Sequence, residues 1–321
     1  MRNVTLLTLC LALCLLRVSY GQQRLVVFGD SLSDDGNSFV ATKGQVPPGP
    51  PAGAYGETFD GTGAVFLGRF TDGQNWVDYF PGIAEQFGVH IPPVTAYQQN
   101  PNSDSATDFA VGGATSADLN AIDSALGGLL TQINNYGTYI KSHANAADDL
   151  CVIWIGPNDF DFAAQIKPTD TVANIKGAIE NLYLAGARNF VVVTIADFAL
   201  TPRVKALGGA AVFAATQFVV TANVLLAVEL PRLAFARQIS IDLVDINAIF
   251  IPLVLSPASF GFTNSTTPAL AALAANPNTD PNDYVFWDDF HPTTKVHKLA
   301  AAFIFKNIFF NRQIRPFLSL R

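Results

Sequence analysis

Charged residues and cysteines are scarce in this 321-residue sequence. Charged side chains make up 14% of the chain and hydrophobic ones 50%, which excludes the composition of a disordered protein and predicts a large buried core. The formal net charge is −7, and no basic stripe with interleaved aromatic residues occurs, so the sequence predicts no nucleic acid partner. With no Pro/Ser-rich linker and no internal repeat, we expect one globular domain over residues 22–321.

The chain contains only three cysteines: Cys10, Cys14 and Cys151. The first two lie in an N-terminal segment with Arg2, an apolar run over residues 6–16 and small residues over 19–21, which is the pattern of a secretory signal peptide. We expect residues 1–21 to be a signal peptide and the protein to be secreted and extracellular, in a compartment that permits disulfides. Cys151 then has no partner, and its place in a predicted strand indicates a small buried hydrophobic side chain.

Short apolar runs rich in β-branched residues alternate with longer segments of helical character. The runs cover residues 24–28, 106–111, 150–155, 189–195 and 238–244. Helices are expected near residues 74–88, 118–142, 170–186, 209–235 and 292–310. Continuous apolar strands are typical of a parallel sheet covered on both faces, so the pattern predicts a three-layer α/β/α sandwich with a central parallel sheet of about five strands.

One apolar segment, from Ala206 to Val228, carries no charge and is long enough to cross a membrane. Polar residues such as Gln217 and Asn223 interrupt it, and Pro231 follows soon after. We therefore expect a helix that is largely buried against the sheet, and no stable membrane insertion.

A candidate nucleophile follows the first apolar run, in the sequence FGDSLSDDGN. Sharp turns after parallel strands are where α/β proteins place reactive groups, because the strand is rigid and backbone amides converge beyond it. Ser31 lies in this turn, although its hydroxyl needs a base before it can attack. The neighbouring acids Asp34 and Asp35 do not fit the spacing of an EF-hand calcium loop, so no metal is assigned, and Asp30 is expected to shape the turn through local hydrogen bonds.

The base is expected to be His291, in the sequence WDDFH. Asp288 can reach the imidazole around the same turn, fix its tautomer and leave the other ring nitrogen for Ser31. Asp289 is the alternative orienting acid, but it stands only two residues before the histidine. The other histidines lack an acid in a comparable turn and are expected to be structural or solvated: His90, His143 and His297.

Two further segments offer donors for the oxyanion of an acyl-transfer reaction. In DFAVGGATS, paired glycines allow a close backbone approach; Gly113 is the preferred donor and Gly112 the alternative. In CVIWIGPND, the Asn158 carboxamide can donate without carrying a titrating charge. The backbone amide of Ser31 would be the third donor.

These four segments, in this order, resemble the GDSL family of lipases and esterases, also called SGNH hydrolases, and the resemblance spans nearly the whole chain after residue 21. It implies a flavodoxin-like fold and no cofactor. It also implies site residues: Ser31, Asp288 and His291 as catalytic residues, and Ser31, Gly113 and Asn158 as the oxyanion hole. The sequence GRFTDGQNW, residues 68–76, further resembles the GRFSNG-x-x-W stretch of fungal secreted acetylesterases in carbohydrate esterase family 16.

The segment over residues 44–73 is rich in proline and glycine and has the composition of an ordered loop. Its aromatic residues are irregularly placed: Tyr55, Phe59, Phe66 and Phe70. The loop either walls the substrate cleft or is merely anchored to the core by these aromatics, and Trp76 has the same two interpretations. No substrate-binding residue is assigned, and Asn264 in an Asn-Ser-Thr sequon is a glycosylation candidate in a eukaryotic secretory pathway.

We therefore predict a secreted serine esterase that hydrolyses carboxylic esters through an acyl-enzyme, with a small-molecule or oligosaccharide ester as its partner. The narrower expectation is removal of acetyl groups from sugars or hemicellulose oligosaccharides. One alternative is a lipase or phospholipase that acts on longer acyl chains. The other, from a different class, is a non-catalytic carbohydrate-binding or interaction protein that retains the fold.

Overall fold

The computed structural model describes residues 24–49, 55–58, 64–102, 105–142, 146–160 and 166–310. The predicted signal peptide over residues 1–21 lies outside these ranges, as do His143, Phe59 and part of the 44–73 segment.

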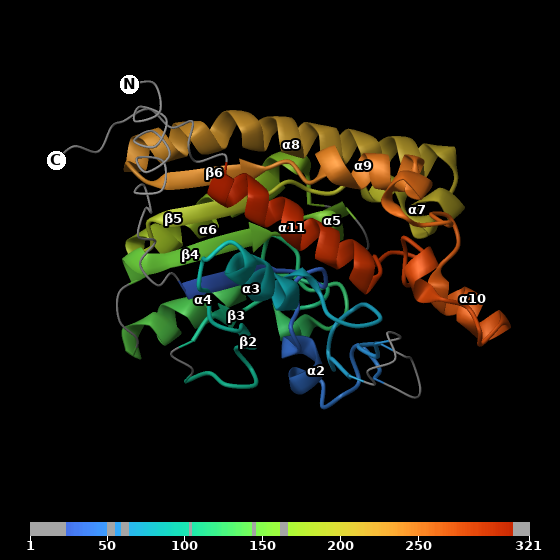
Figure 1. Ribbon diagram of the computed structural model, residues 1–321. Helices are drawn as coiled ribbons and strands as arrows, with labels where there is room; N and C mark the ends of the chain where they lie inside the picture. The colour runs from blue at the N-terminus through green and yellow to red at the C-terminus, as the bar shows by residue number, and fades with distance from the viewer. Residues whose placement is uncertain are drawn as a thin grey trace, which may run out of the picture.

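Six parallel strands form the central sheet in the order β2-β3-β1-β4-β5-β6 (Figure 1). The strands are β1 (Arg24–Gly29), β2 (Thr95–Ala96), β3 (Thr107–Asp108), β4 (Asp149–Trp154), β5 (Asn189–Val193) and β6 (Ser240–Val244). Without β2 the order is that of a flavodoxin-like sheet, so the predicted fold class is confirmed. The sequence missed β2 because this edge strand has only two residues and follows two prolines instead of lying in an apolar run.

The order of the strands reverses at β1, and this reversal indicates where a ligand would bind at the carboxyl ends of the strands. β1 pairs with β4 over its whole length, from Arg24 opposite Asp149 to Gly29 opposite Trp154. The carboxyl ends of these two strands therefore lie side by side next to the reversal. In open α/β sheets ligands bind in the crevice at this point.

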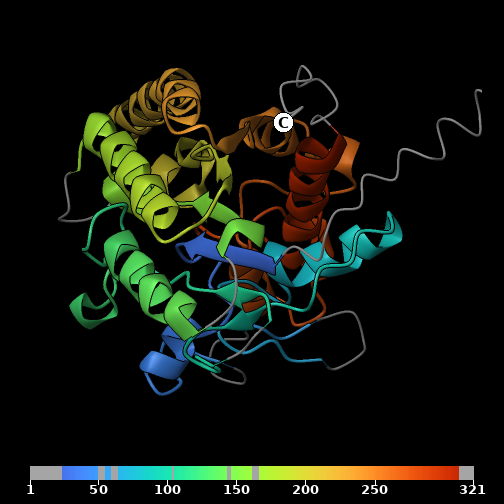
Figure 2. The same ribbon diagram turned by 90° about the vertical axis from the view of Figure 1, so that its left-hand side faces the viewer.

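Helices cover both faces of the sheet, as the apolar strands predict (Figure 2). One face carries α4 (Leu129–Tyr139), α6 (Pro168–Leu184) and α8 (Gly209–Arg237), and the other carries α3 (Trp76–Gln86) and α11 (Thr294–Phe310). In β1 the alternation is direct, because Val26 and Phe28 contact the first group of helices and Leu25 and Val27 the second. The three layers of the predicted sandwich follow from this alternation.

In the described part of the chain, five shorter helices lie outside the predicted set, since each is too short to give a periodic signal. They are α2 (Asn37–Ala41), α5 (Pro157–Phe160), α7 (Pro202–Ala206), α9 (Asn247–Leu255) and α10 (Ala269–Ala275).

The helix expected over residues 118–142 begins only at Leu129. Side chains ahead of it hold the backbone in turns: Asn120 Oδ1 accepts the N–H groups of Ile122 and Asp123, and Asp123 Oδ1 accepts that of Ala125. Such local hydrogen bonds compete with helix formation, which explains the error.

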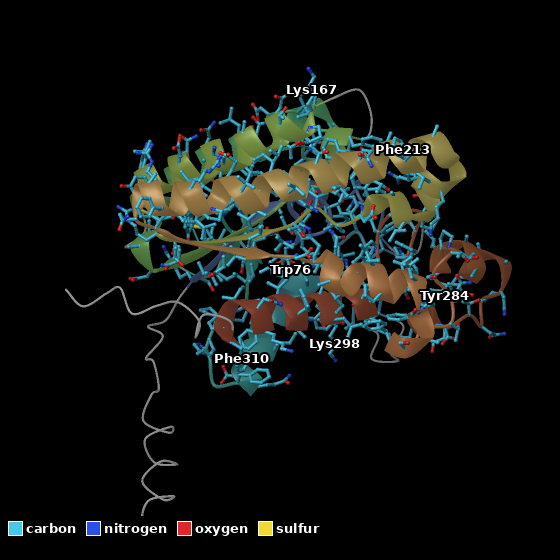
Figure 3. The ribbon with its side chains drawn as sticks, turned by 90° about the horizontal axis from the view of Figure 1, so that it is seen from above. Trp76, Lys167, Phe213, Tyr284, Lys298 and Phe310 are labelled. Atoms are coloured by element: carbon cyan, nitrogen blue, oxygen red, sulfur yellow. The ribbon has the colours of Figure 1, made fainter. Side chains whose placement is uncertain are left out.

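Helix α8 is less buried than the sequence suggested. Only one side of it packs inward, and the other exposes large apolar side chains such as Phe213, at 67% exposure (Figure 3). Phe235, near the end of the helix, is 80% exposed. Within the described ranges it is the helix that is long and apolar enough to cross a membrane, and 28% of its most apolar stretch is buried. The expectation of a largely buried helix is therefore wrong: two rows of inward residues are enough to hold it on the sheet and on α6.

Replacement of Phe190 tests how much the packing between the sheet and α6 contributes to stability. The Phe190 side chain is fully buried in β5, so Phe190→Ala is expected to lower the free energy of unfolding by about 3–5 kcal/mol, through lost burial and a residual cavity. Urea denaturation measures the change. Leu184→Ala, at a position with 79% exposure, is the control and should stay within about 0.5 kcal/mol of the wild type; equal losses in the two variants would contradict this assignment of the core.

Candidate active site

Ser31 stands in a tight turn directly after β1. The Asp30 carboxylate accepts the Leu32 N–H at 3.0 Å, and the Asp30 carbonyl accepts two further N–H groups of the turn at 3.0 Å. Gln132 of α4 fixes the end of the strand, because its carboxamide bonds both the N–H and the carbonyl of Gly29. Burial raises the pKa of Asp30 to about 7. Asp30 thus has the local structural contacts expected of it, and only 7% of the Ser31 surface is exposed.

His291 reaches Ser31 from the loop before α11, 260 residues further along the chain. Its Nε2 lies 2.8 Å from Ser31 Oγ, and its Nδ1 lies 2.7 Å from Asp288 Oδ2. The other Asp288 oxygen accepts the backbone N–H groups of Phe290 and His291 at 2.8 and 2.6 Å, which closes the turn. The structure therefore brings Ser31, His291 and Asp288 together in hydrogen-bonding order.

The electrostatics of this loop favour an ionised Asp288. Burial acts to raise the pKa of its carboxyl, but the facing His291 and the hydrogen bonds from His291 and Phe290 outweigh burial and hold the pKa well below its usual range. Asp289, the alternative orienting acid, points elsewhere: its carboxylate pairs with Arg203 at 2.8 Å. The geometry thus selects Asp288 as the partner of the imidazole.

The two glycines of DFAVGGATS have different surroundings. The Gly112 N–H donates to Asp34 Oδ2 and to Ser38 Oγ, both at 2.8 Å, and a side chain at Gly112 would strike the Phe70 ring. Gly113 has a φ of +76°, which favours glycine, and among the described residues no acceptor contacts its N–H. Of the two amides, that of Gly113 is the one available to an oxyanion.

Asn158 lies in the first turn of α5, beyond the end of β4, with 7% of its surface exposed. One N–H of its carboxamide donates to the Ala114 carbonyl at 3.0 Å, which orients the group and leaves the second N–H for another acceptor. The adjacent Asp159 accepts the Ser116 N–H at 2.7 Å. These two bonds join the glycine turn to the α5 turn.

The segment over residues 68–76 braces the nucleophile turn. Trp76 is fully buried and its Nε1 donates to Ser33 Oγ at 3.0 Å, while Asn75 donates to the carbonyls of Ser33 and Asp34 (Figure 3). Arg69 forms an ion pair with Asp35 and donates to its carbonyl at 2.8 Å. Trp76 therefore has a supporting position beneath the turn instead of lining a cleft.

The same segment also holds the histidine loop. Thr71 Oγ1 donates to the Pro292 carbonyl at 2.8 Å, and Asp72 Oδ1 accepts the Thr294 N–H at 2.7 Å. The Phe70 ring lies 5.3 Å from the imidazole of His291. Residues 68–76 thus connect the two halves of the site, a role that their sequence does not reveal.

Sequence reasoning missed one contact of the site. The hydroxyl of Tyr55 donates to Asp288 Oδ2 at 2.8 Å. An aromatic residue in an irregular loop gives no signal for such a bond, because its partner lies 233 residues away.

An apolar cavity of about 50 Å³ lies next to these residues. Its lining includes chain neighbours of Ser31, Asn158 and His291, namely Leu32, Pro157, Phe290 and Pro292. The buried indole N–H of Trp154, another lining residue, has no hydrogen-bond partner in the described part of the chain.

Among the described residues, the remaining sequence candidates make no hydrogen bond to Ser31, His291 or Asp288, although His297 lines the apolar cavity. Cys151 is fully buried in β4, His297 is buried in α11, and His90 pairs with Glu85 on the surface. Asn264 is half-buried, and its Oδ1 accepts nearby N–H groups. Across the residues that the structure describes, no group of three His, Cys, Asp or Glu side chains could hold a metal ion.

Comparison with known proteins identifies the family of the chain. Residues 25–304 match the profile of the GDSL-like lipase/acylhydrolase family. The chain belongs to this family. It is thus a serine hydrolase that acts on ester bonds.

Individual relatives are distant. The thermolabile hemolysin of Vibrio parahaemolyticus is 27% identical over 87% of this chain, which spans 62% of that protein. Acetylajmalan esterase 2 of Rauvolfia serpentina is 27% identical over 88% of this chain and 89% of its own length. Among solved structures, the carbohydrate acetylesterase Est24 of Sinorhizobium meliloti aligns with a TM-score of 0.46 and 13% identity, over 89% of this chain and 98% of that one.

Asn158→Ala tests the predicted oxyanion donor. The variant is expected to lower kcat by about 10²–10³-fold, because one donor to the developing negative charge is lost. Steady-state kinetics on a p-nitrophenyl ester measure the loss. Asn174→Ala is the control, since Asn174 lies on α6 and its carboxamide donates to Ser116 Oγ. Equal kcat values for the two variants would remove Asn158 from the oxyanion hole.

Asp72 makes the stability of the chain depend on pH. Burial raises its pKa to about 6, against about 3.9 in an unfolded chain, so the folded state binds the extra proton between these values. The free energy of unfolding of the wild type should therefore fall relative to Asp72→Asn by about 2 kcal/mol as the pH rises from 4 to 7. Urea denaturation of both proteins across this range measures the difference, and parallel pH curves would contradict it.

Proposed function

We propose that the chain is an esterase whose nucleophile, base and orienting acid are Ser31, His291 and Asp288. The observation that carries this proposal is the chain of contacts from Ser31 Oγ to His291 Nε2, at 2.8 Å, and from His291 Nδ1 to Asp288, at 2.7 Å. Such contacts allow proton removal from a serine hydroxyl and stabilise the imidazolium that forms.

In the first half-reaction, Ser31 Oγ attacks the ester carbonyl carbon while His291 Nε2 takes the hydroxyl proton. The carbonyl oxygen becomes negative and is bound by the N–H groups of Ser31 and Gly113 and by the Asn158 carboxamide. The imidazolium then gives its proton to the alcohol oxygen, the ester C–O bond breaks, and the acyl group stays on Ser31. In the second half, His291 deprotonates a water that attacks the acyl carbon, and collapse releases the carboxylic acid and restores Ser31.

Short acyl groups, acetyl above all, are the proposed substrates, carried by sugars or hemicellulose oligosaccharides. Two observations support this. Residues 68–76 resemble the corresponding stretch of fungal acetylesterases, and a relative of nearly equal length is named an acetylajmalan esterase. The apolar cavity beside Leu32 and Phe290 is the space that would receive the acyl group.

Longer acyl chains are the second candidate. The observation that favours them is the exposed apolar side of α8, including Phe213 and Val224, which is of the kind that contacts lipid or other apolar partners. A relative named as a hemolysin agrees with this alternative, although the chain covers only 62% of that protein.

We also propose that residues 1–21 are a signal peptide, that residues 22–321 form one secreted domain, and that Asn264 carries a glycan in a eukaryotic host. The N-terminal residue pattern supports the first point. One continuous sheet with helices on both faces supports the second.

Chain-length preference tests the proposed substrate. Rates on p-nitrophenyl acetate, butyrate and palmitate are expected to fall in that order, and acetate should be released from acetylated xylo-oligosaccharides. Ser31→Ala should lower kcat by about 10⁴-fold or more. Ser105→Ala is the matched control and should keep wild-type rates, because Ser105 lies before the amino end of β3 and its hydroxyl donates to the Pro93 carbonyl.

Each outcome discriminates between the candidates. A preference for palmitate would replace the acetylesterase by a lipase. Equal rates for the wild type and Ser31→Ala would refute the mechanism and leave a non-catalytic binding protein.

A further inference from the structure

The carboxylate of Asp288 has four hydrogen-bond donors, which is about as many as its two oxygens can accept. Oδ1 accepts the backbone N–H groups of Phe290 and His291. Oδ2 accepts His291 Nδ1 at 2.7 Å and the Tyr55 hydroxyl at 2.8 Å. Three of the donors belong to the histidine loop itself, and only Tyr55 comes from another part of the chain.

We propose that Tyr55 is a positioning residue that holds the Asp288 carboxylate against His291. This inference rests on the proposed function, since it assigns Tyr55 a role through the residue that orients the base. Without the hydroxyl, the loop alone would fix one oxygen, and the other would be held only by the ring that it has to orient.

The backbone around Tyr55 is fixed independently of Asp288. Gly56 N–H donates to the Thr71 carbonyl at 2.7 Å, and Gly56 O accepts the Phe66 N–H at 2.5 Å. An antiparallel bridge between Glu57 and Val65 continues this pairing. Because the Thr71 hydroxyl in turn donates to the Pro292 carbonyl, the pairing that carries Tyr55 is attached one residue beyond His291.

Packing holds the ring as well. The Tyr55 ring meets Trp287 edge to face, with 6.1 Å between the ring centroids. Trp287 is fully buried and is the residue before Asp288. The hydroxyl is thus presented to Asp288 by a ring whose own position is set by the same loop, so little rotational freedom is left to lose when the bond forms.

Tyr55 donates at every pH at which the enzyme can be assayed. Burial and the facing Asp288 carboxylate raise the pKa of Tyr55 far above its usual value. Asp289 and Arg203 are the other charged groups near this hydroxyl. Asp288, Asp30 and His297 interact electrostatically with the imidazole, and burial lowers the pKa of His297 to about 3, so the ring of His297 is neutral.

Because Tyr55 and His291 share Oδ2 of Asp288, loss of the tyrosine hydroxyl should change the attraction between Asp288 and His291 in a defined direction. A second donor spreads the negative charge of Asp288, so the carboxylate attracts the imidazolium less strongly than it would alone. Removing the hydroxyl should let the carboxylate turn, which lowers kcat, and should strengthen its pull on the proton of His291. The acid limb of the pH profile of kcat/KM should then move to higher pH.

Tyr55→Phe tests the inference, because it removes the hydroxyl and keeps the ring on Trp287. We expect kcat to fall about 10-fold, KM to change less than about 2-fold, and the acid limb to move upward. The matched control is Tyr136→Phe. Tyr136 also donates to a buried aspartate, Asp149 at 2.7 Å, but Asp149 lies at the amino end of β4, away from the catalytic residues. It should lose stability and keep the wild-type kcat and pH profile.

A double-mutant cycle separates this inference from the proposed mechanism. If Tyr55 acts through Asp288, Tyr55→Phe should have no further effect on kcat in an Asp288→Asn enzyme. A wild-type kcat and pH profile for Tyr55→Phe, a change confined to KM, or full additivity with Asp288→Asn would each overturn the positioning role. An unchanged kcat for Asp288→Asn alone would instead overturn the proposed triad.

Discussion

Buried carboxylates that accept backbone N–H groups hold the catalytic edge of this protein together. Asp34 accepts the N–H groups that begin α2 and also that of Gly112, so one side chain ties the nucleophile turn to the glycine turn. Asp159 and Asp72 make the same kind of bond to Ser116 and Thr294. Turns at the end of a sheet leave N–H groups that no strand can satisfy, and an acceptor within the protein is the alternative to water.

These carboxylates differ from Asp288 in their electrostatics. Burial disfavours the charged form of four of these carboxyls and raises their pKa: Asp34, Asp72, Asp108 and Asp159. Among the aspartates of the described residues whose pKa is shifted, Asp288 alone has a lowered one, because a histidine and the amides of its own turn face it. Asp288 is thus the ionised acid beside the imidazole, and it holds His291 in the tautomer that leaves Nε2 for Ser31.

The sequence predicted those parts of the molecule that depend on near neighbours. Continuous apolar strands imply a parallel sheet, and Asp288 and His291 share one turn, so both could be read locally. Tyr55 could not, because nothing in its surroundings points to a partner 233 residues away. The late start of α4 and the edge strand β2 were missed for a related reason: side-chain bonds in a turn and a two-residue pairing leave no periodic pattern.

The segment over residues 68–76 is an instructive intermediate case. Its residue pattern marked it as important, and the structure gives the reason: Arg69, Trp76 and Thr71 support the nucleophile turn and the histidine loop at once. A stretch that resembles part of an esterase family therefore does not have to touch substrate in order to be required for activity. Specificity must be sought in other residues, such as those that line the small apolar cavity.

The sheet and the site are completed at different points of the chain. The last strand, β6, ends at Val244, whereas the imidazole arrives more than 40 residues later, at His291. During synthesis, the strands of the sheet and Ser31 would therefore leave the ribosome before His291, so the sheet could form while the serine still lacked its base. Hydrolytic activity would be acquired only after the sheet is complete, when α11 docks on α3 and brings the histidine loop to the end of β1.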